Sequence, residues 1–389
     1  MVALHSDKAQ TLNINQTTKA VRYMNKRLYT TPEGVRDIYD GEAKFKLDLE
    51  GKLRNKLHLY GFEDIETPTF EYFEVFSEER GSVRVRDLYK FFDRDGNTLV
   101  LRPDMTPSIA RCAAKYFKDE PGPVRFCYCG KTFINNHEYQ GKQKESTQLG
   151  CELINDPSVT ADAEMIAATI DCLLTSGLTE FRIDIGDVRF FNALIAETGL
   201  DEEKIYSLKN YIIDKNSFGL YDFLREENVP EEIKEILSDL PNQFGGVECL
   251  DNIRSLIKNN DALAAVDHLK SLYELLKAYG FEKYVGFDLG MISKYEYYTG
   301  IIFHAYTYDV GESIASGGRY DNLVGQFGKD AAAIGMTIIT DKLLLALSRQ
   351  GLIKKTIINP EIMDAKADPI RAIKKATLAR SQGRSCVIQ

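Results

Sequence analysis

The chain of 389 residues lacks several features that would place it in other classes of protein. No apolar run approaches the ~20 residues of a membrane-spanning helix, and no secretory leader pattern opens the sequence. No glycine-rich loop connects a strand to a helix, which excludes a phosphate-binding P-loop and a dinucleotide-binding fingerprint. The net charge of −9 argues against a broad nucleic-acid-binding surface, because neutralising phosphates requires clustered Lys and Arg.

The seven cysteines show no pair of closely spaced pairs of the kind that binds structural zinc. Cys127 and Cys129 are two apart in an apparent strand, so their side chains share one face, which is typical of core packing. An odd number of cysteines without a secretory leader fits a reducing compartment. We therefore expect a cytoplasmic protein without a bound metal or cofactor.

The composition that remains is ordinary for a globular protein, with 44% hydrophobic and 28% charged residues. A chain of this length can hold one large core or two to three domains. Residues 1–28 carry five Lys or Arg against Asp7 alone, and we expect a basic N-terminal tail there. A cleaved targeting segment is the alternative for these residues.

Hydrophobic periodicity predicts the order of helices and strands. Phe45, Leu49, Leu53 and Leu57 recur every four residues and predict an amphipathic helix over 40–59. Asp95-Gly96 lies between two β-type runs and predicts a hairpin turn. Further patterns predict strands at 62–67, 89–92, 99–101, 124–128, 148–154, 181–185, 284–289, 300–307, 312–315 and 333–339, and helices at 161–176 and 341–349.

Strands with helices inserted between them predict an α+β fold with a mainly antiparallel sheet. The last forty residues are too few for another α/β domain of typical size. The expected parts are an N-terminal tail (1–28), the first part of a core (29–187), a helical insertion (188–280), the second part of the core (281–349) and a short C-terminal helical extension (350–389).

Two polar pairs are candidates for a ligand site. Asp104 and Thr106 follow Pro103, and their side chains project in the same direction if the backbone stays extended. A carboxylate and a hydroxyl so placed would bind an ammonium group, and the alternative is a helix cap. Gln148 and Glu152 share one face of a predicted strand. If that face is buried, a small polar ligand would supply their hydrogen-bond partners; the alternative is a solvated face.

Three other features near the end of the predicted core are less specific. Tyr297 and Tyr298 are adjacent in a predicted strand, so we expect them to point to opposite sides. Gly317-Gly318 predicts a tight turn. His304 has no evident partner, and a structural or surface role is expected rather than a catalytic one. The order of these features along the chain is more informative than any one of them.

In that order, the segments from Thr31-Pro32-Glu33-Gly34-Val35-Arg36-Asp37 to about Leu345 resemble the catalytic core of histidyl-tRNA synthetase, a class II aminoacyl-tRNA synthetase. The resemblance implies a six-stranded antiparallel sheet flanked by helices, and a homodimer. It also implies a histidine site in which Asp104, Thr106 and Gln148 hold the α-amino group. Its imidazole side would be formed by Glu152, Tyr297, Tyr298 and Tyr320, the last within Gly317-Gly318-Arg319-Tyr320-Asp321.

The departures from that family concern the cations that hold ATP. Where the synthetase has an arginine after an aromatic residue in its second motif, this chain has Ile134 after Phe133. Where it has Arg-Gly upstream of the paired tyrosines, this chain has Ser293-Lys294, and Lys342 replaces an arginine of the third motif. Preorganised donors stabilise charge on phosphate, and losing one costs about 10²–10³ in rate. We therefore expect no catalytic residue. As a separate departure from that family, we expect no anticodon-binding domain.

A synthetase-like core with a histidine site but without these arginines resembles the regulatory subunits of ATP phosphoribosyltransferase. The resemblance implies a short-form catalytic subunit as partner, in a hetero-octamer that contains homodimers of this chain. It implies activation of that partner and feedback inhibition by L-histidine in the first step of histidine biosynthesis, without tRNA or membranes. The alternatives are a divergent enzyme that forms histidyl-adenylate, using Lys131, Lys142 and Lys144 as substitute cations, and a histidine-sensing module of another complex.

Overall fold

The computed structural model describes residues 28–77, 83–136, 143–292, 297–353 and 360–389. The chain forms two compact units. The larger unit contains residues 48–352 with the described residues up to Asp37, and the smaller unit contains residues 38–47 and 353–389. The N-terminal tail that we expect over 1–28 lies outside the described residues, except for Leu28.

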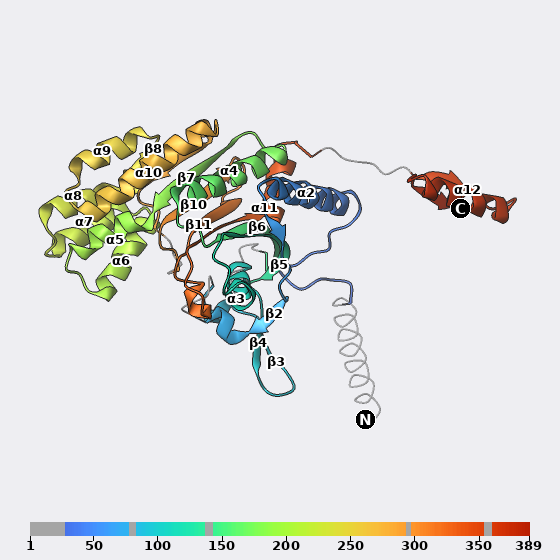
Figure 1. Ribbon diagram of the computed structural model, residues 1–389, viewed down its shortest axis with the longest axis horizontal. Coiled ribbons are helices and arrows are strands. Elements are labelled where there is room, and N and C mark those ends of the chain that lie inside the picture. Colours follow the sequence, from blue (N-terminus) through green and yellow to red (C-terminus); the bar gives the residue numbers. More distant parts are fainter. Residues whose placement is uncertain (1–27, 78–82, 137–142, 293–296, 354–359) are drawn as a thin grey trace, which may run out of the picture. The chain divides into compact units, whose positions relative to one another are not determined.

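The centre of the larger unit is a sheet that has nine strands among the described residues, in the order β1-β5-β6-β12-β11-β10-β7-β9-β8 (Figure 1). Neighbouring strands from β5 to β7 are antiparallel, whereas β1 pairs with β5, and β7 with β9, in parallel. The predicted α+β fold with a mainly antiparallel sheet is confirmed, and short edge strands make it larger than the six strands expected. The strands are β1 (Glu63–Asp64), β5 (Val124–Phe133), β6 (Glu145–Ile154), β7 (Phe181–Asp187), β8 (Phe244–Gly245), β9 (Val285–Asp288), β10 (Ile301–Thr307), β11 (Ala315–Arg319) and β12 (Ala333–Ile339).

Helices cover both faces of this sheet because each face presents apolar side chains at every second strand position. On one face, α4 (Val159–Thr175) packs against β11 and β12. The hydroxyl of Ser158 caps this helix by accepting a hydrogen bond from the amide of Ala161. On the other face, α3 (Thr106–Tyr116) packs in the apolar cluster that contains Tyr128. The predicted helices over 40–59 and 341–349 form as α2 (Asp40–Leu59) and α11 (Thr340–Arg349).

The region between β7 and β9 is almost entirely helical, and Figure 1 shows its helices gathered at the β7 end of the sheet. It is not all-helical as expected, because β8 pairs with β9 and extends the sheet by two residues, too few to produce an alternating pattern. No helix of the described residues combines the length and apolar composition needed to cross a membrane. The helices of this region are α5 (Val188–Ala196), α6 (Glu202–Ile213), α7 (Ser217–Glu226), α8 (Glu231–Asp239), α9 (Glu248–Leu256) and α10 (Asn260–Ala278).

A separate small sheet has the order β2-β4-β3, with β2 at Phe70–Tyr72, β3 at Lys90–Phe92 and β4 at Thr98–Leu101. The predicted hairpin at Asp95-Gly96 connects β3 to β4 and is confirmed. The carboxylate of Asp93 closes this turn by accepting hydrogen bonds from two backbone amides of the loop. Strand β2 was not predicted, because three residues give no recognisable period.

The smaller unit contains two short parallel strands, β13 (Glu361–Met363) and β14 (Cys386–Ile388), on either side of α12 (Pro369–Ser381) in the chain. Ala376 and Ala379 of α12 pack against Cys386. The C-terminal extension that we expect to be helical therefore contains α12 and, in addition, two short strands. Strands of three residues are too short to be told from loop residues by periodicity.

Candidate functional site

Polar side chains from several segments converge on the carboxyl group of Glu152, which is fully buried in β6. The hydroxyl of Thr106 donates to Oε1 of Glu152 at 2.7 Å, and the hydroxyl of Tyr320 donates to Oε2 at 2.5 Å. The hydroxyl of Tyr128 on β5 lies 3.5 Å from Oε1. The solvated face considered as the alternative is excluded, because these protein groups replace water around a buried carboxyl.

Asp104 and Gln148 meet at one backbone amide beside this carboxyl. The amide of Met105 donates to Oδ1 of Asp104 at 2.8 Å and to Oε1 of Gln148 at 3.2 Å. Both side chains are buried. The helix-cap alternative is wrong for Thr106, because that residue begins α3 while its hydroxyl bonds across to Glu152. We call Asp104, Thr106, Tyr128, Gln148, Glu152 and Tyr320 the Glu152 cluster.

The paired tyrosines lie next to the Glu152 cluster. Tyr297 and Tyr298 precede β10 and are not in a strand, and their ring centroids are 4.6 Å apart. The expectation that they point to opposite sides of a strand is therefore wrong. The ring of Tyr297 packs edge-on against Tyr320, with 6.2 Å between the ring centroids, and Tyr298 packs against the same apolar cluster. All seven residues that the sequence assigns to a ligand site thus lie together.

Gly317 and Gly318 lie inside β11, so the tight turn expected there is wrong. Each is paired on both sides, with β10 and with β12. A Cβ on Gly318 would lie 2.6 Å from the carbonyl oxygen of Ile301 and 2.7 Å from the ring of Tyr298. Glycine is needed at position 318 for close packing and not for a turn. The ring of Tyr298 occupies the space that a side chain at this position would need.

Burial controls the charge of Glu152. The loss of solvent raises its pKa to about 8, a shift that the nearby Asp104 carboxylate increases and the hydrogen bonds from Tyr320 and Thr106 reduce. Burial and the Glu152 carboxyl also raise the pKa of Tyr320, which stays a hydrogen-bond donor. A buried acid that is largely protonated at neutral pH can ionise when a cationic or N–H-bearing ligand comes within hydrogen-bonding distance.

The residues that replace the synthetase cations do not restore them in the described part of the chain. Ile134 follows the end of β5 and its amide donates to the carbonyl of Lys144. Lys342 on α11 pairs with Glu312 at 2.6 Å, and Lys131 forms an ion pair with Glu145. The expected departure at Ser293-Lys294 and the suggested cation Lys142 lie outside the described residues.

The two arginines that are buried in the described residues are also engaged with protein groups. Arg102 donates to the backbone carbonyls of Thr67, Pro68 and Lys131. Arg319 is paired with an aspartate on α4. Both guanidinium groups are therefore held by other groups of the protein.

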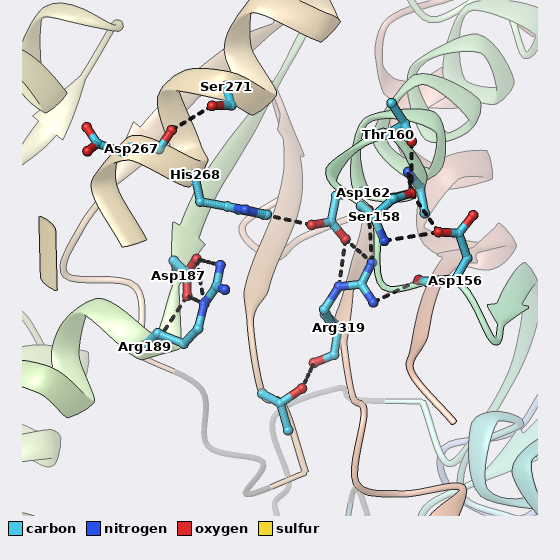
Figure 2. A network of polar contacts seen from close by, with 12 residues as sticks. Asp156, Ser158, Thr160, Asp162, Asp187, Arg189, Asp267, His268, Ser271 and Arg319 are labelled. Carbon is cyan, nitrogen blue, oxygen red and sulfur yellow. Dashed lines mark hydrogen bonds and ion pairs between the residues drawn. The ribbon is translucent and has the colours of Figure 1, made fainter. Parts of the chain in front are cut away.

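Arg319 belongs to a buried network between β11 and the helices α4 and α10, shown in Figure 2. The fully buried Asp162 accepts two hydrogen bonds from Arg319 on Oδ1, at 2.8 and 2.6 Å, and contacts Nε2 of His268 with Oδ2 at 2.8 Å. His268 comes from α10, so this network links the helical region to the strand that leads into the Glu152 cluster. The sequence does not reveal it, because more than a hundred residues separate His268 from Asp162 along the chain.

Two further residues differ from what the sequence indicated. His304 lies 3.2 Å from the hydroxyl of Tyr306, so it has a partner that the sequence did not reveal. Burial lowers the pKa of His304, which keeps the ring neutral at physiological pH. Tyr128 was missed as a member of the site, although its register opposite Gly150, between Gln148 and Glu152, follows once β5 and β6 are paired.

Comparison with known proteins extends these observations. A family model described as histidyl-tRNA synthetase matches residues 34–343. A protein of Acetivibrio thermocellus named "ATP phosphoribosyltransferase regulatory subunit" is 42% identical over 82% of this chain and 77% of its own length. The chain belongs to the ATP phosphoribosyltransferase regulatory subunit family. A member of this family from Ruminiclostridium cellulolyticum is 37% identical over 90% of this chain and 84% of its own length.

Solved structures agree with membership of this histidyl-tRNA synthetase-like family. A crystal structure from Bacillus halodurans C, described as an ATP phosphoribosyltransferase regulatory subunit/histidyl-tRNA synthetase, has a TM-score of 0.84 and 33% identity, and covers 93% of this chain and 92% of that chain. The histidyl-tRNA synthetase of Nostoc sp. PCC 7120 has a TM-score of 0.77 at 22% identity, covering 93% of this chain and 86% of that chain, and shows the shared fold. The predicted class II synthetase-like fold is confirmed.

Proposed function

We propose that this chain is a non-catalytic regulatory subunit of ATP phosphoribosyltransferase and that it binds L-histidine at the Glu152 cluster. The names of the relatives support the regulatory role. The observation that carries the ligand assignment is the convergence of Thr106, Tyr320 and the Asp104–Gln148 pair around one buried carboxyl group. A protein interior that buries this many polar groups together is arranged for a polar ligand.

The chemistry of the Glu152 cluster matches the groups of a histidine molecule. An α-ammonium group needs oxygen acceptors, and Asp104 and Gln148 supply two beside the hydroxyl of Thr106. An imidazole N–H needs one acceptor, and the Glu152 carboxyl supplies it with Tyr320 as a further polar contact. The neighbouring rings of Tyr297 and Tyr298 offer apolar surface for the flat face of the imidazole.

Two side chains make this chain unsuited to binding ATP for catalysis: one follows the end of β5 and the other lies on α11. An aliphatic Ile134 cannot bind a phosphate, and Lys342 is already paired with Glu312. Lysine also lacks the planar, bidentate guanidinium group with which arginine stacks on an adenine and contacts phosphate. The reaction is assigned instead to a short-form catalytic subunit, which this chain activates.

Inhibition by histidine requires that the ligand bind two states of the complex with different affinity. A coupling free energy of about 1–3 kcal/mol corresponds to about a 5- to 150-fold difference in affinity between the two states. The complex is proposed to be a cytoplasmic hetero-octamer that contains homodimers of this chain, with no role for tRNA. Support for the homodimer comes from the small sheet, where Phe70, Tyr72 and Phe91 lie exposed on one face.

The test combines the purified chain with a short-form catalytic subunit and follows ATP consumption with and without histidine. We expect the chain to stimulate the reaction and histidine to suppress it. Glu152→Gln should raise the histidine concentration needed for half inhibition by at least ~10-fold, because a hydrogen bond to a charged group is lost. Glu203→Gln, on the exposed side of α6, is the matched control and should leave this concentration unchanged.

Two outcomes would contradict the proposal in different ways. Histidine-dependent exchange of pyrophosphate into ATP by the isolated chain would show a divergent synthetase. No stimulation of any short-form catalytic subunit, with specific binding of histidine retained, would indicate a histidine sensor of another complex.

A further inference from the structure

Three side chains of types that can ligate a metal meet at the β1 edge of the sheet. His58 lies in the last turn of α2, Asp64 in β1 and Cys127 in β5. Nε2 of His58 is 3.1 Å from Oδ2 of Asp64, and Sγ of Cys127 is 3.5 Å from Oδ1 of the same carboxylate. Their potential ligand atoms all lie within 4.8 Å of one another. The three groups come from separate elements, which is why no paired-cysteine pattern in the sequence reveals them.

A small tetrahedral ion would need these ligand atoms at the corners of one tetrahedron. With zinc bond lengths of about 2.1 Å to nitrogen and oxygen and 2.3 Å to sulfur, neighbouring ligand atoms lie about 3.4–3.6 Å apart. His58 and Cys127 approach different oxygens of Asp64, at 3.1 and 3.5 Å, and the three ligand atoms all lie within 4.8 Å of one another, so rotations of the exposed side chains would bring them to these separations. One imidazole, one carboxylate and one thiolate are ligands that zinc accepts, and three protein ligands leave the fourth position for water.

We propose that His58, Asp64 and Cys127 form a binding site for Zn²⁺ that is separate from the Glu152 cluster. Cys127 and Tyr128 are consecutive in β5, so their side chains lie on opposite faces of the sheet. The zinc site therefore faces away from Glu152, and it joins the end of α2 to the β1–β5 edge. The ion would link an element that packs over the sheet to the strands themselves.

Zinc binding would replace two contacts that the carboxylate of Asp64 makes without the ion. Without the ion, Arg54 neutralises the carboxylate of Asp64 at 3.2 Å, and the Cys127 thiol donates its proton to that carboxylate.

Zinc binding breaks the S–H bond of Cys127, forms a Zn–S bond and releases one proton to solvent, while His58 binds as the neutral imidazole. Arg54 can move away from Asp64 when zinc binds, because its side chain is 44% exposed and stays on the surface of the protein.

The probe for this site is Co²⁺, which occupies tetrahedral zinc sites and absorbs visible light strongly only there. The full-length chain, freed of metal with a chelator, is titrated with Co²⁺. We expect one equivalent to bind, with the visible bands of a tetrahedral ion and a near-ultraviolet thiolate-to-cobalt charge-transfer band. Added Zn²⁺ should abolish these bands by displacing the cobalt.

Three variants assign the ligands. Cys127→Ala should abolish the charge-transfer band. His58→Gln should weaken Co²⁺ binding at least ~10-fold, because even the loss of an outer-shell partner of a metal ligand typically costs about 10- to 100-fold in affinity. His58 is 39% exposed, so this second variant tests the site even if Cys127→Ala fails to fold. Cys112→Ala, which removes a half-buried thiol on α3, is the control and should retain every band.

The proposal is overturned if wild-type protein shows no charge-transfer band at one equivalent of Co²⁺. It is also overturned if the band survives in Cys127→Ala or if His58→Gln binds Co²⁺ as tightly as wild type. None of these readings depends on histidine binding or on a catalytic subunit, so failure here leaves the proposed function untouched.

Discussion

Gly335 lies directly opposite Glu152 on the paired strands β12 and β6. A Cβ placed on Gly335 would be 1.6 Å from Oε2 and 3.0 Å from Oε1 of the Glu152 carboxyl. The carboxyl group therefore occupies the space that any other side chain at position 335 would need. This relationship lets Glu152 turn toward Tyr320 and Thr106 while remaining inside the sheet.

The substitution Gly335→Ala should move the Glu152 carboxyl and disrupt its hydrogen bonds. Overpacking of a tight interior usually costs about 1–3 kcal/mol of unfolding free energy, and lost hydrogen bonds should also weaken histidine binding at least ~10-fold. Urea denaturation and titration calorimetry measure the two effects. Adding Glu152→Ala to Gly335→Ala should recover much of the stability but none of the binding, because the clash is removed together with the ligand contact.

Gly51 offers the matched control for this substitution. It lies within α2, has an ordinary backbone conformation, and a Cβ added there would meet no atom within 4 Å. Gly51→Ala should raise stability by about 0.5–1 kcal/mol, because alanine is the better helix former. Equal stability of Gly335→Ala and wild type would contradict the role assigned to Gly335.

The raised pKa of Glu152 predicts how stability depends on pH. The folded protein holds the Glu152 proton up to a pKa of about 8, whereas the unfolded chain loses it near 4.5. Between these values the folded state binds more protons, so this group makes stability fall as pH rises, by up to about 1.4 kcal/mol per pH unit. Well above the folded-state pKa both states are ionised, and the contribution of Glu152 no longer changes.

Urea denaturation of wild type and Glu152→Gln between about pH 5 and 8.5, the window in which the two states differ in bound protons, measures this dependence. The glutamine variant should lose the part of the slope that belongs to Glu152, because an amide does not titrate. Identical slopes for the two proteins would show that the carboxyl is ionised throughout this range in the folded state.

The sequence could group the seven residues assigned to a ligand site because each belongs to a short motif whose order is informative, and the structure places them close together. Gln148 and Glu152 also followed from simple strand alternation, which the structure reproduces in β6. The orientation predicted for Tyr297 and Tyr298 was wrong because the strand begins only at Ile301. Local pattern alone cannot locate the first residue of a strand, because pairing with a distant neighbour decides it.

The features that escaped prediction depend on contacts between distant segments. Gly318 is required by the ring of Tyr298, which belongs to the segment before β10, and no local signal distinguishes that requirement from a turn. The contact between Asp162 and His268 joins α4 to α10. Helix periodicity could predict that both helices exist but not which buried groups face each other. Pairing and packing supply that information.

The buried network around Asp162 should contribute strongly to stability. Asp162→Ala leaves Arg319 buried and without its carboxylate partner on α4, which typically costs about 3–5 kcal/mol. His268→Ala should cost less, about 1–3 kcal/mol, because the ring is partly exposed and Arg319 still balances the charge of Asp162. Chemical denaturation gives both values. A smaller loss for Asp162→Ala than for His268→Ala would contradict the central position of Asp162 in the network.

The exposed face of the small sheet gives a prediction about self-association. Phe70, Tyr72 and Phe91 are 53%, 56% and 37% exposed, and their strand register places them on one face. If this face forms the proposed homodimer, Phe70→Ser combined with Phe91→Ser should shift the chain toward monomer, with a loss of about 1–3 kcal/mol in association for each buried ring removed.

Phe92 provides the control within the same strand. Its side chain is 73% exposed but alternates to the other face of β3, so Phe92→Ser should leave association unchanged. Light scattering after size-exclusion chromatography, over a range of protein concentrations, distinguishes monomer from dimer. A dimer that resists the double substitution as well as the control must use a different surface, because removing two large rings from the centre of an interface cannot leave its affinity intact.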